Sequence, residues 1–336
     1  MIQEEVSLKQ YNTFGIEAIA KRFSKFSSLE DLTQILAQKG NDELLVLGGG
    51  SNILLTKDFN GLVILNEIKG FDIVSKNENT VTIKVGSGEI WHDFVLKCID
   101  NNFGGIENLS LIPGSVGASP MQNIGAYGVE IKDVFLELEA YHIETGEIKT
   151  FSHQECQFGY RESVFKKSLK DQYIIISVTY KLSKQSHSIK ADYGAIQEQL
   201  RAFDITEPTI KNISDAVIAI RSSKLPDPKV IGNAGSFFKN PVVEKSVLEK
   251  IQLTHENVPN YPAENGLVKL AAGWLIEKAG WKGKTYGKYG VHKNQALVLV
   301  NYADCSGADI LKLSSDIIES VLFQFGVLLE REVNIL

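Results

Sequence analysis

The sequence lacks the features that mark disulfide-rich, membrane-spanning or nucleic-acid-binding proteins. Its 336 residues include three cysteines, which are far apart and form no C-x-x-C pair, so neither a disulfide framework nor a zinc or other metal site is predicted. No apolar run approaches the roughly 18 residues of a membrane span. The net charge is −6, which leaves no basic excess to neutralise a nucleic-acid backbone.

The composition is that of an ordinary globular protein. Hydrophobic residues make up 43% and charged residues 23%, and the length favours two domains or three small ones. The N-terminal residues 1–7 are acidic and carry no hydrophobic segment, so no secretory signal is predicted. We therefore expect a cytoplasmic protein that binds neither membrane nor nucleic acid.

The hydrophobic periodicity predicts an α+β protein. Ser28 is a predicted helix cap, with Asp31 three residues later and Gly40 ending the helix. A proline-rich stop at 225–228 indicates the start of a further domain. Other helices are predicted over 89–101, 192–203, 208–223, 244–253, 268–278 and 308–325, and strands over 44–47, 62–65, 81–85, 134–143, 147–151, 173–182, 236–239, 296–301 and 328–333.

Two glycine-rich segments are candidate binding loops. The first, Gly48-Gly49-Gly50-Ser51-Asn52, follows a predicted buried strand, and its glycines would let the backbone approach a phosphate closely. A dinucleotide fingerprint would need glycine at position 53, where Ile53 stands, so a Rossmann domain is not predicted. A tight strand-to-strand turn is the alternative explanation.

The second segment covers residues 112–128 and is more informative. It reads I-P-G-S-V-G-A-S-P-M-Q-N-I-G-A-Y-G and offers backbone donors, two serine hydroxyls and two amide side chains. These groups suit a polyphosphate joined to a flat heterocycle, whereas a structural Ω-loop is the alternative. Elsewhere, Gly283-Lys284-Thr285 lacks the first glycine of a phosphate-binding P-loop, and no G-x-S-x-G supports a serine hydrolase.

Taken with further motifs, these loops resemble the UDP-N-acetylenolpyruvoylglucosamine reductase family, also called UDP-N-acetylmuramate dehydrogenases. The motifs cover nearly the whole chain in order, and the long loop and G-S-F-F-K-N-P are the most specific. Beyond the two loops they are N-T-F-G-I at 12–16, F-G-Y-R-E-S at 158–163, R-S-S-K-L-P-D-P at 221–228, G-N-A-G-S-F-F-K-N-P at 232–241 and K-L-A-A-G-W-L-I at 269–276.

The resemblance implies an FAD-binding domain of the vanillyl-alcohol-oxidase type, built from two α+β subdomains at 1–66 and 67–224. A C-terminal α+β substrate-binding domain would cover 225–336. The implied reaction uses NADPH, through FAD, to reduce UDP-N-acetylglucosamine enolpyruvate to UDP-N-acetylmuramate. This step belongs to peptidoglycan synthesis, and so to cell-wall biogenesis, cell shape and cell division. We expect a monomer.

The resemblance also implies residue roles. In related flavoproteins a histidine can bond covalently to the flavin, but the loop at 112–128 has none, so non-covalent FAD is expected. Arg161 would hold the substrate carboxylate, Ser236 would give a proton to carbon, and Glu332 would orient or polarise this cluster. Tyr193 matches the mobile tyrosine of the family's longer type.

The expected binding residues fall into two groups. Those for FAD are Gly48, Gly49, Gly50, Ser51, Asn52, Ser115, Gly117, Ser119, Pro120, Asn123, Gly125, Ala126 and Arg221. Those for the UDP-sugar are Tyr160, Tyr193, Lys224, Asn240, Lys282 and Gln295.

One departure from the family is that Asn334 stands where a basic residue commonly follows the Glu-Val pair, which puts the placement of Glu332 in question. Two other classes of protein stay open from the residues. One is an oxidase of the same flavin superfamily that uses oxygen. The other is a non-catalytic protein that binds sugar nucleotides.

Overall fold

The computed structural model describes all residues, 1–336, and divides into two compact units. None of its helices has the length and apolar character needed to cross a membrane. The first unit comprises Met1–Val6, Ala20–Gly49 and Asn60–Ser223, and the second comprises Ser7–Ile19, Gly50–Phe59 and Lys224–Leu336.

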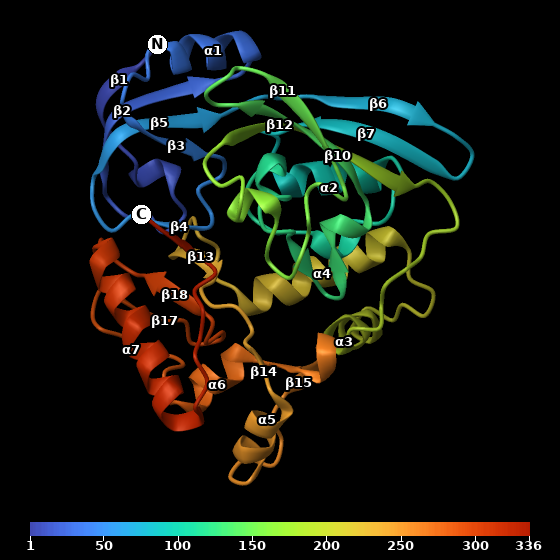
Figure 1. The fold of residues 1–336 in the computed structure, drawn as a ribbon. Coiled ribbons are helices and arrows are strands. Elements are labelled where there is room, and N and C mark those ends of the chain that lie inside the picture. Colours follow the sequence, from blue (N-terminus) through green and yellow to red (C-terminus); the bar gives the residue numbers. More distant parts are fainter. The chain divides into compact units, whose positions relative to one another are not determined.

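Two sheets form the framework of the first unit (Figure 1). A four-stranded sheet has the order β1-β2-β5-β3, with β3 and β5 parallel, and a five-stranded antiparallel sheet has the order β11-β10-β12-β7-β6. The strands are β1 (Gln3–Ser7), β2 (Ile19–Phe26), β3 (Glu43–Leu47), β5 (Phe59–Asn66), β6 (Phe71–Lys76), β7 (Thr80–Gly86), β10 (Phe135–His142), β11 (Ile148–Ser152) and β12 (Tyr173–Ser183).

Helix α1 (Leu29–Ala37) begins as predicted. The Ser28 side chain accepts a hydrogen bond from the Asp31 N–H group, and the Asp31 carboxylate accepts one from the Ser28 N–H group. The buried face of α1 carries Leu32 and Ile35, which belong to the same apolar cluster as Ile174 of β12. Burial of this cluster therefore joins the two sheets of the first unit.

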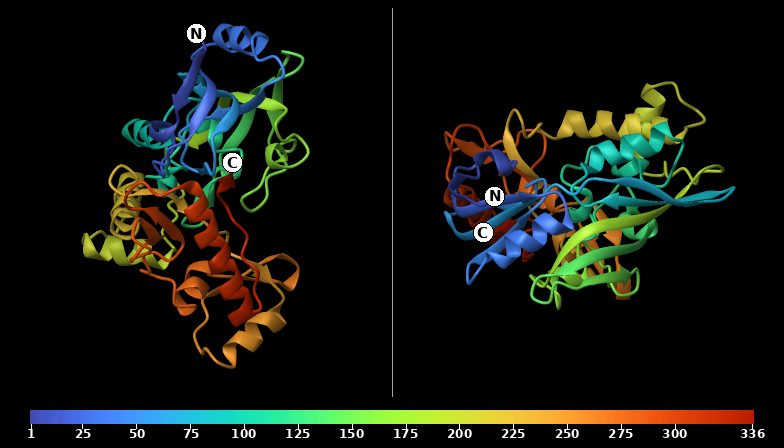
Figure 2. Two further views of the ribbon diagram at one scale, coloured as in Figure 1. Left: turned by 90° about the vertical axis from the view of Figure 1, so that its left-hand side faces the viewer. Right: turned by 90° about the horizontal axis from the view of Figure 1, so that it is seen from above.

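Helices cover the rest of the first unit. Helix α2 (Trp91–Asp100) presents Trp91, Phe94 and Val95 to a core that also contains Tyr180 of β12. Helices α3 (Gly194–Ala202) and α4 (Ile210–Lys224) lie side by side (Figure 2), joined by a cluster that includes Ile196 and Val217. The long loop at 112–128 is held by short elements: η3 (Val116–Ala118), β8 (Gly125–Ala126) and β9 (Val129–Glu130).

The second unit contains two three-stranded sheets and a two-stranded parallel pair. The sheet β13-β18-β17 packs against α7, and β14-β16-β15 packs against α5. The elements are β4 (Ile53–Leu54), β13 (Gly232–Ser236), β14 (Val242–Val243), α5 (Lys245–Gln252), β15 (Asn260–Pro262), β16 (Val268–Leu270), α6 (Ala272–Lys278), β17 (Tyr289–Val291), β18 (Val298–Asn301), α7 (Gly307–Phe325) and β19 (Asn334–Ile335).

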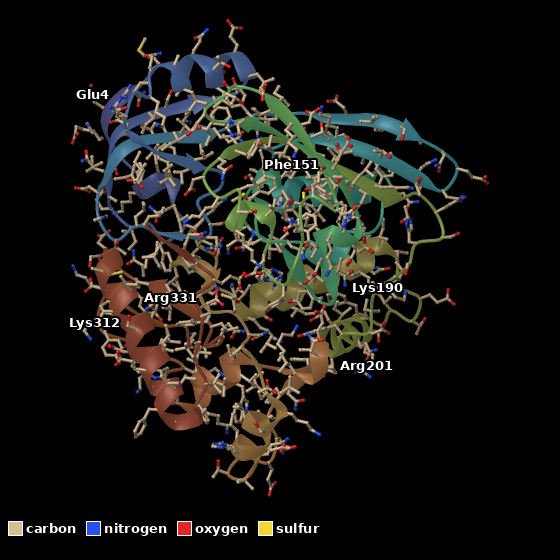
Figure 3. All side chains as sticks on the ribbon, in the orientation of Figure 1. Glu4, Phe151, Lys190, Arg201, Lys312 and Arg331 are labelled. Atoms are coloured by element: carbon tan, nitrogen blue, oxygen red, sulfur yellow. The ribbon has the colours of Figure 1, made fainter.

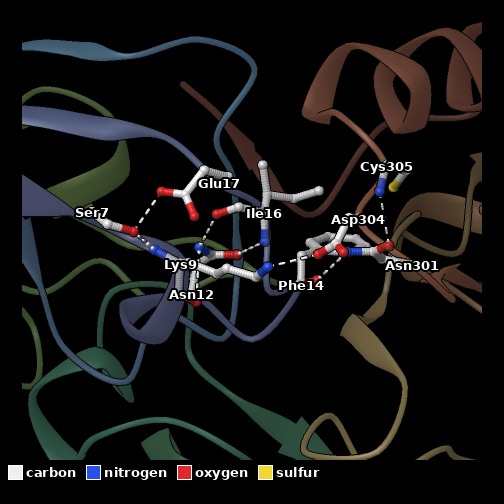
Figure 4. A network of polar contacts seen from close by, with 9 residues as sticks. All are labelled: Ser7, Lys9, Asn12, Phe14, Ile16, Glu17, Asn301, Asp304 and Cys305. Carbon is white, nitrogen blue, oxygen red and sulfur yellow. Dashed lines mark hydrogen bonds and ion pairs between the residues drawn. The ribbon is translucent and has the colours of Figure 1, made fainter.

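The N-terminal motif at 12–16 is built into the second unit by a polar network (Figure 4). The Asn12 amide donates to the Leu8 and Ile16 carbonyls at 2.8 and 2.9 Å, and the Asn301 amide donates to the Phe14 carbonyl at 2.9 Å. Residues 7–19 and 50–59, which the resemblance puts in the first FAD-binding subdomain, therefore group with 224–336. The three-part domain division itself stays a prediction.

Three predicted elements differ most from the structure. The helix predicted over 268–278 begins only at Ala272, because Val268–Leu270 pair with two strands as β16. The strand predicted over 236–239 lies earlier, as β13. Residues 328–333 form only an isolated bridge, and the last strand, β19, begins at Asn334 because the chain end pairs with β4.

Candidate functional site

The two glycine-rich loops are in direct contact within the first unit. A Cβ atom built on Gly48 would stand 2.3 Å from the Ser115 Oγ atom, and one on Gly49 would stand 2.7 Å from the Gly114 Cα atom. Real Cβ contacts are not this short. The Ser115 hydroxyl can rotate away from position 48, but position 49 faces main chain, so the approach there requires glycine. The main chains of the two loops therefore form one surface, on which a phosphate group of a ligand can bind.

This surface carries suitable donors. The N–H group of Gly49 donates to no other part of the chain, and the next residue, Gly50, begins a segment of the second unit. Gly50 has a φ of +59°, the left-handed conformation found in loops whose successive N–H groups bind anions. The set of donors fits a pyrophosphate such as that of FAD.

Side chains of the long loop are already engaged within the first unit. The Ser119 hydroxyl is 2.7 Å from the Tyr180 hydroxyl, and the Asn123 amide donates to the Glu130 carboxylate at 2.9 Å and the Gly159 carbonyl at 3.0 Å. These side chains shape the loop, so we expect its contacts to FAD to come from the main chain. The remaining predicted members of the loop are Gly117, Pro120, Gly125 and Ala126, of which Pro120 is buried and the others are half-buried.

Arg221 brings a positive charge to the same loop. From α4 its Nε atom donates to the Leu111 carbonyl at 3.3 Å. Burial lowers the pKa of Arg221, and the Tyr127 oxygen only partly offsets that effect. These neighbours carry no negative charge, so an anionic ligand would complete the surroundings of the guanidinium.

His92 lies in the same neighbourhood in its neutral form. Burial is the main cause that lowers the pKa of His92; the Asp93 charge opposes this effect, and the Arg221 charge adds to it. The His92 Nδ1 atom accepts a hydrogen bond from the Leu111 N–H group at 3.0 Å, which an imidazolium could not do. His92 therefore supports the loop and leaves Arg221 as the cation beside it.

Arg161 is fixed against the other end of the long loop. Its Nη2 atom donates to the Gly125 carbonyl at 2.7 Å, and its guanidinium lies 5.3 Å from the centre of the Tyr160 ring. The φ of Arg161 is +57°, a conformation that costs a non-glycine residue on the order of 1–3 kcal/mol and is concentrated at functional sites. Arg161 and Tyr160 are thus held together beside Gly125.

Tyr193 stands at the N-cap of α3, so the helix begins two residues later than predicted. Its side chain is 43% exposed. The ring packs edge-on against the Tyr127 ring, with centroids 5.3 Å apart and planes at 89°. An exposed tyrosine in a short segment before a helix matches what a closing loop requires.

In the second unit Ser236 is turned outward at the end of β13. The pairing with β18 slips between Asn233 and Ser236, and Gly235 between them has a φ of +68°. Such a bulge re-aims the following side chain. Ser236 is accordingly exposed, whereas Phe237 after it is buried.

The C-terminal segment places Glu332 beside this bulge. The Glu332 N–H group donates to the Phe237 carbonyl at 2.8 Å, the Lys239 N–H group donates to the Glu330 carbonyl at 2.9 Å, and Arg331 bridges Phe238. Arg331, labelled in Figure 3, is anchored through its side chain to α7. Glu332 and Ser236 therefore lie at neighbouring positions on adjacent backbone segments.

Asn334 holds the chain end in place of the basic residue that is common in the family. Its N–H group and its side-chain amide both donate to the Asn52 carbonyl, at 3.1 and 2.9 Å, while the Asn52 amide donates to the Glu332 carbonyl at 3.3 Å. Parallel pairing of β19 with β4 continues this contact. The departure at Asn334 therefore does not leave the backbone of Glu332 loose.

Predicted substrate residues of the second unit gather at the start of α6. The Asn240 Oδ1 atom accepts a hydrogen bond from the Ala272 N–H group at 3.0 Å, and a Cβ atom on Gly273 would stand 3.2 Å from the Gln295 Oε1 atom. Lys282, after α6, is instead paired with Glu277 at 3.0 Å. Lys224, the last residue of α4, is exposed.

Sequence reasoning missed the residues that link these groups. Tyr127 lies inside the recognised loop, but nothing in its spacing indicates that its ring packs on Tyr193. Asn108 was not singled out, although it is buried and its amide donates to the Tyr127 and Lys190 carbonyls.

The fold and the two contacting glycine-rich loops, at 48–52 and 112–128, define an FAD-binding protein, and comparison with known families agrees. Residues 23–152 match the model of an FAD binding domain, and residues 227–336 match the model described as UDP-N-acetylenolpyruvoylglucosamine reductase, C-terminal domain. The predicted α+β fold, with an FAD-binding domain followed by a C-terminal domain, is confirmed.

Curated relatives match over the whole chain. A UDP-N-acetylenolpyruvoylglucosamine reductase of Flavobacterium johnsoniae is 55% identical over 335 residues, covering 100% of this chain and 99% of the relative. One of Amoebophilus asiaticus is 50% identical over 337 residues, with 100% and 99% coverage. The crystal structure of the Thermus caldophilus enzyme superposes with a TM-score of 0.70 at 22% identity, over 100% of this chain and 99% of that one, which supports the fold. The chain belongs to the UDP-N-acetylenolpyruvoylglucosamine reductase family and is an oxidoreductase.

The contact between the two glycine-rich loops can be tested by substitution. We expect Gly49→Ala to weaken FAD binding and to cost about 1–3 kcal/mol of stability, because the new methyl group meets the Gly114 backbone and the loops must separate. The measurement is FAD titration of the apoprotein together with thermal unfolding. Gly194→Ala is the matched control, since nothing lies within 4 Å of its Cβ position. Equal effects of the two substitutions would contradict a requirement for close loop contact at Gly49.

Proposed function

We propose that this protein catalyses the NADPH-dependent, FAD-mediated reduction of UDP-N-acetylglucosamine enolpyruvate to UDP-N-acetylmuramate, a step of peptidoglycan precursor synthesis. The observation that supports the proposal is the hydrogen bond from the Glu332 N–H group to the carbonyl of Phe237, the residue after Ser236. The full length of the chain also matches proteins named as UDP-N-acetylenolpyruvoylglucosamine reductases. We further propose that it acts in the cytoplasm as a monomer and binds neither nucleic acid nor membrane.

Bound FAD supplies the chemistry of accepting a hydride from NADPH and passing it to the terminal carbon of the enolpyruvyl group. Negative charge then develops on the adjacent carbon and spreads into the substrate carboxylate. The Arg161 guanidinium can hold that carboxylate with two parallel hydrogen bonds and stabilise the growing charge.

The Ser236 hydroxyl then delivers its proton to the carbon that bears the charge. A serine hydroxyl is a weak acid, so its position and its neighbours must assist the transfer. Glu332 orients or polarises this group from the adjacent segment. The bulge at Gly235 turns Ser236 outward and so makes its hydroxyl available to a ligand.

The remaining proposed residues bind FAD or the UDP-sugar. Gly48–Asn52, the main chain of 112–126 and Arg221 hold FAD, with the pyrophosphate on the donors of the glycine turn. Tyr160, Tyr193, Lys224, Asn240, Lys282 and Gln295 hold the UDP-sugar, whose two phosphates need cations or hydrogen-bond donors.

The function is tested by following NADPH oxidation at 340 nm with and without UDP-N-acetylglucosamine enolpyruvate. We expect rapid oxidation only when the enolpyruvyl compound is present, and none with UDP-N-acetylglucosamine, which lacks the reducible double bond. Oxidation that proceeds at the same rate in air without the substrate would favour the oxygen-using oxidase. A purified protein that neither carries nor takes up flavin would favour a binding protein.

We expect the FAD to be tightly bound and releasable. The glycine loops supply backbone donors, and the loop at 112–128 contains no histidine for covalent attachment. After acid precipitation the yellow colour should appear in the supernatant. Colour that stays with the denatured pellet would mean a covalent bond.

We expect Tyr193→Phe to weaken binding of the UDP-sugar while leaving FAD binding unchanged. If the phenol donates to a phosphate, its loss costs roughly the ~1.5–3 kcal/mol of a hydrogen bond to a charged group. The ring and its packing on Tyr127 remain in this variant, so the change isolates the hydroxyl. Titration of the enzyme with UDP-N-acetylmuramate gives the dissociation constant, and an unchanged value would remove Tyr193 from the site.

A further inference from the structure

Lys239, three residues after Ser236, is a nearly buried cation of the second unit. Its side chain is 11% exposed, and its Nζ atom lies 2.5 Å from the Oε1 atom of Glu330, whose own side chain is 71% exposed. A buried ammonium group costs free energy unless it is paired. The ion pair therefore ties the segment that begins at Glu330 to the chain around Lys239.

The main chain of the same residues forms a short antiparallel ladder. The Lys239 N–H group donates to the Glu330 carbonyl at 2.9 Å. The Glu332 N–H group donates to the Phe237 carbonyl at 2.8 Å, and the two bonds flank an isolated bridge. Opposite residues of such a ladder project to one face, and the faces alternate along each segment. The pair of Lys239 with Glu330 thus lies one step along the ladder from Glu332.

Glu332 is held from both sides. On its C-terminal side, the Asn334 N–H group and side-chain amide both donate to the Asn52 carbonyl, at 3.1 and 2.9 Å. On its N-terminal side, a ladder of two main-chain hydrogen bonds is weak by itself, because each bond contributes only about 0.5–1.5 kcal/mol net. Opening that ladder would draw Glu330 away and leave the ammonium of Lys239 unpaired, which is costly for a buried charge. The ion pair therefore favours the closed ladder.

We propose that Lys239 is a positioning residue, whose ion pair with Glu330 holds Glu332 in register with the chain that carries Ser236. This inference rests on the proposed function for the roles of Ser236 and Glu332. In this role Lys239 acts through the position of Glu332 and not by contact with the substrate. A displacement of about 1 Å in a reacting group can cost about 10²-fold in rate, so the effect should appear in proton transfer and not in ligand binding.

The first test follows the ladder itself and needs neither NADPH nor UDP-sugar. Hydrogen exchange of the holoenzyme, measured by mass spectrometry on peptides that cover 328–336, reports opening around the Glu332 N–H group. We expect this exchange to be at least about fivefold faster in Lys239→Met, the effect of losing one ordinary contact on an opening equilibrium. Exchange in the remainder of the second unit should stay unchanged.

Lys312→Met is the matched control for that substitution. Lys312, labelled in Figure 3, pairs with Asp316 at 2.9 Å, and both side chains are exposed on α7. An exposed pair of this kind contributes little. Exchange over 328–336 in Lys312→Met should therefore match that of the unaltered protein.

The second test separates the two half-reactions by stopped-flow absorbance. Lys239→Met should bind UDP-N-acetylmuramate and be reduced by NADPH like the unaltered protein, whereas reduction of the enolpyruvyl compound should slow by about 10²-fold. Lys239→Arg, which keeps the charge and can still pair with Glu330, should recover most of that rate. A role in stability alone predicts a lower melting temperature for Lys239→Met with both half-reactions normal.

The outcomes separate the two proposals. Unchanged exchange over 328–336 in Lys239→Met, a normal second half-reaction, or equal slowing of both half-reactions would overturn the role of Lys239. Failure of the unaltered protein to reduce the enolpyruvyl compound would overturn the proposed function, while the exchange result would still decide whether Lys239 holds the segment. If Lys239→Met does not fold, Glu330→Gln decides, because it neutralises the exposed partner. A normal second half-reaction in Glu330→Gln would overturn the proposal.

Discussion

Ser236→Ala should bind FAD and be reduced by NADPH at a near-normal rate, yet fail to reduce the enolpyruvyl substrate at a useful rate. NADPH reduction of the bound flavin requires no proton on carbon, whereas completion of the second half-reaction does. A positioned general acid contributes about 10²–10⁴-fold. We therefore expect the second half-reaction to slow by at least that factor in stopped-flow traces of flavin absorbance.

The competing explanation makes Ser236 an ordinary hydrogen-bonding residue at the end of β13. In that case Ala would cost about 1 kcal/mol of stability, and both half-reactions would proceed normally. Equal slowing of both halves would indicate a displaced flavin. Ser315→Ala is a useful control for stability alone, since that hydroxyl is bonded within the second unit to the Leu311 carbonyl and to Arg331.

Arg161→Lys should also stop the second half-reaction, by about 10²–10³-fold, which is the usual cost of removing one donor to a developing negative charge. Lysine keeps the charge but cannot form the two parallel hydrogen bonds of a guanidinium to a carboxylate. It also loses the arginine donor that fixes the side chain to the Gly125 carbonyl at 2.7 Å.

Arg201→Lys is the matched control for that substitution, because Arg201 is exposed near the end of α3 (Figure 3). We expect it to leave both half-reactions unchanged. NADPH should still reduce the bound FAD in Arg161→Lys, so that only the second half-reaction is slowed. A normal second half-reaction in Arg161→Lys would remove Arg161 from charge stabilisation.

Local signals predicted much of the fold. The capping box at Ser28 located α1, and the periodicity over 308–325 located α7 almost to the residue, because caps and apolar spacing act within a few residues. The strand at 268–270 was missed because one of its pairing partners, β14, is distant in sequence and the other, β15, was itself not predicted. Pairing of that kind leaves no mark on the segment itself.

In the candidate site, too, local features could be predicted from the sequence and contacts between distant residues could not. The glycine loops could be recognised because close backbone contact requires glycine, as at Gly49 against Gly114. What Asn240 contacts could not be predicted, because its partner, the Ala272 N–H group, belongs to a helix that begins 32 residues later. The packing of Tyr127 could not be predicted for the same reason, since Tyr193 reaches it from the distant N-cap of α3.

The most direct test of the central claim is anaerobic reoxidation of the enzyme after reduction by one equivalent of NADPH. Addition of UDP-N-acetylglucosamine enolpyruvate should restore the oxidised flavin spectrum and yield one equivalent of UDP-N-acetylmuramate, identified by mass. UDP-N-acetylglucosamine should leave the flavin reduced. Reoxidation by oxygen alone, with no lactyl ether formed from the enolpyruvyl compound, would contradict the account.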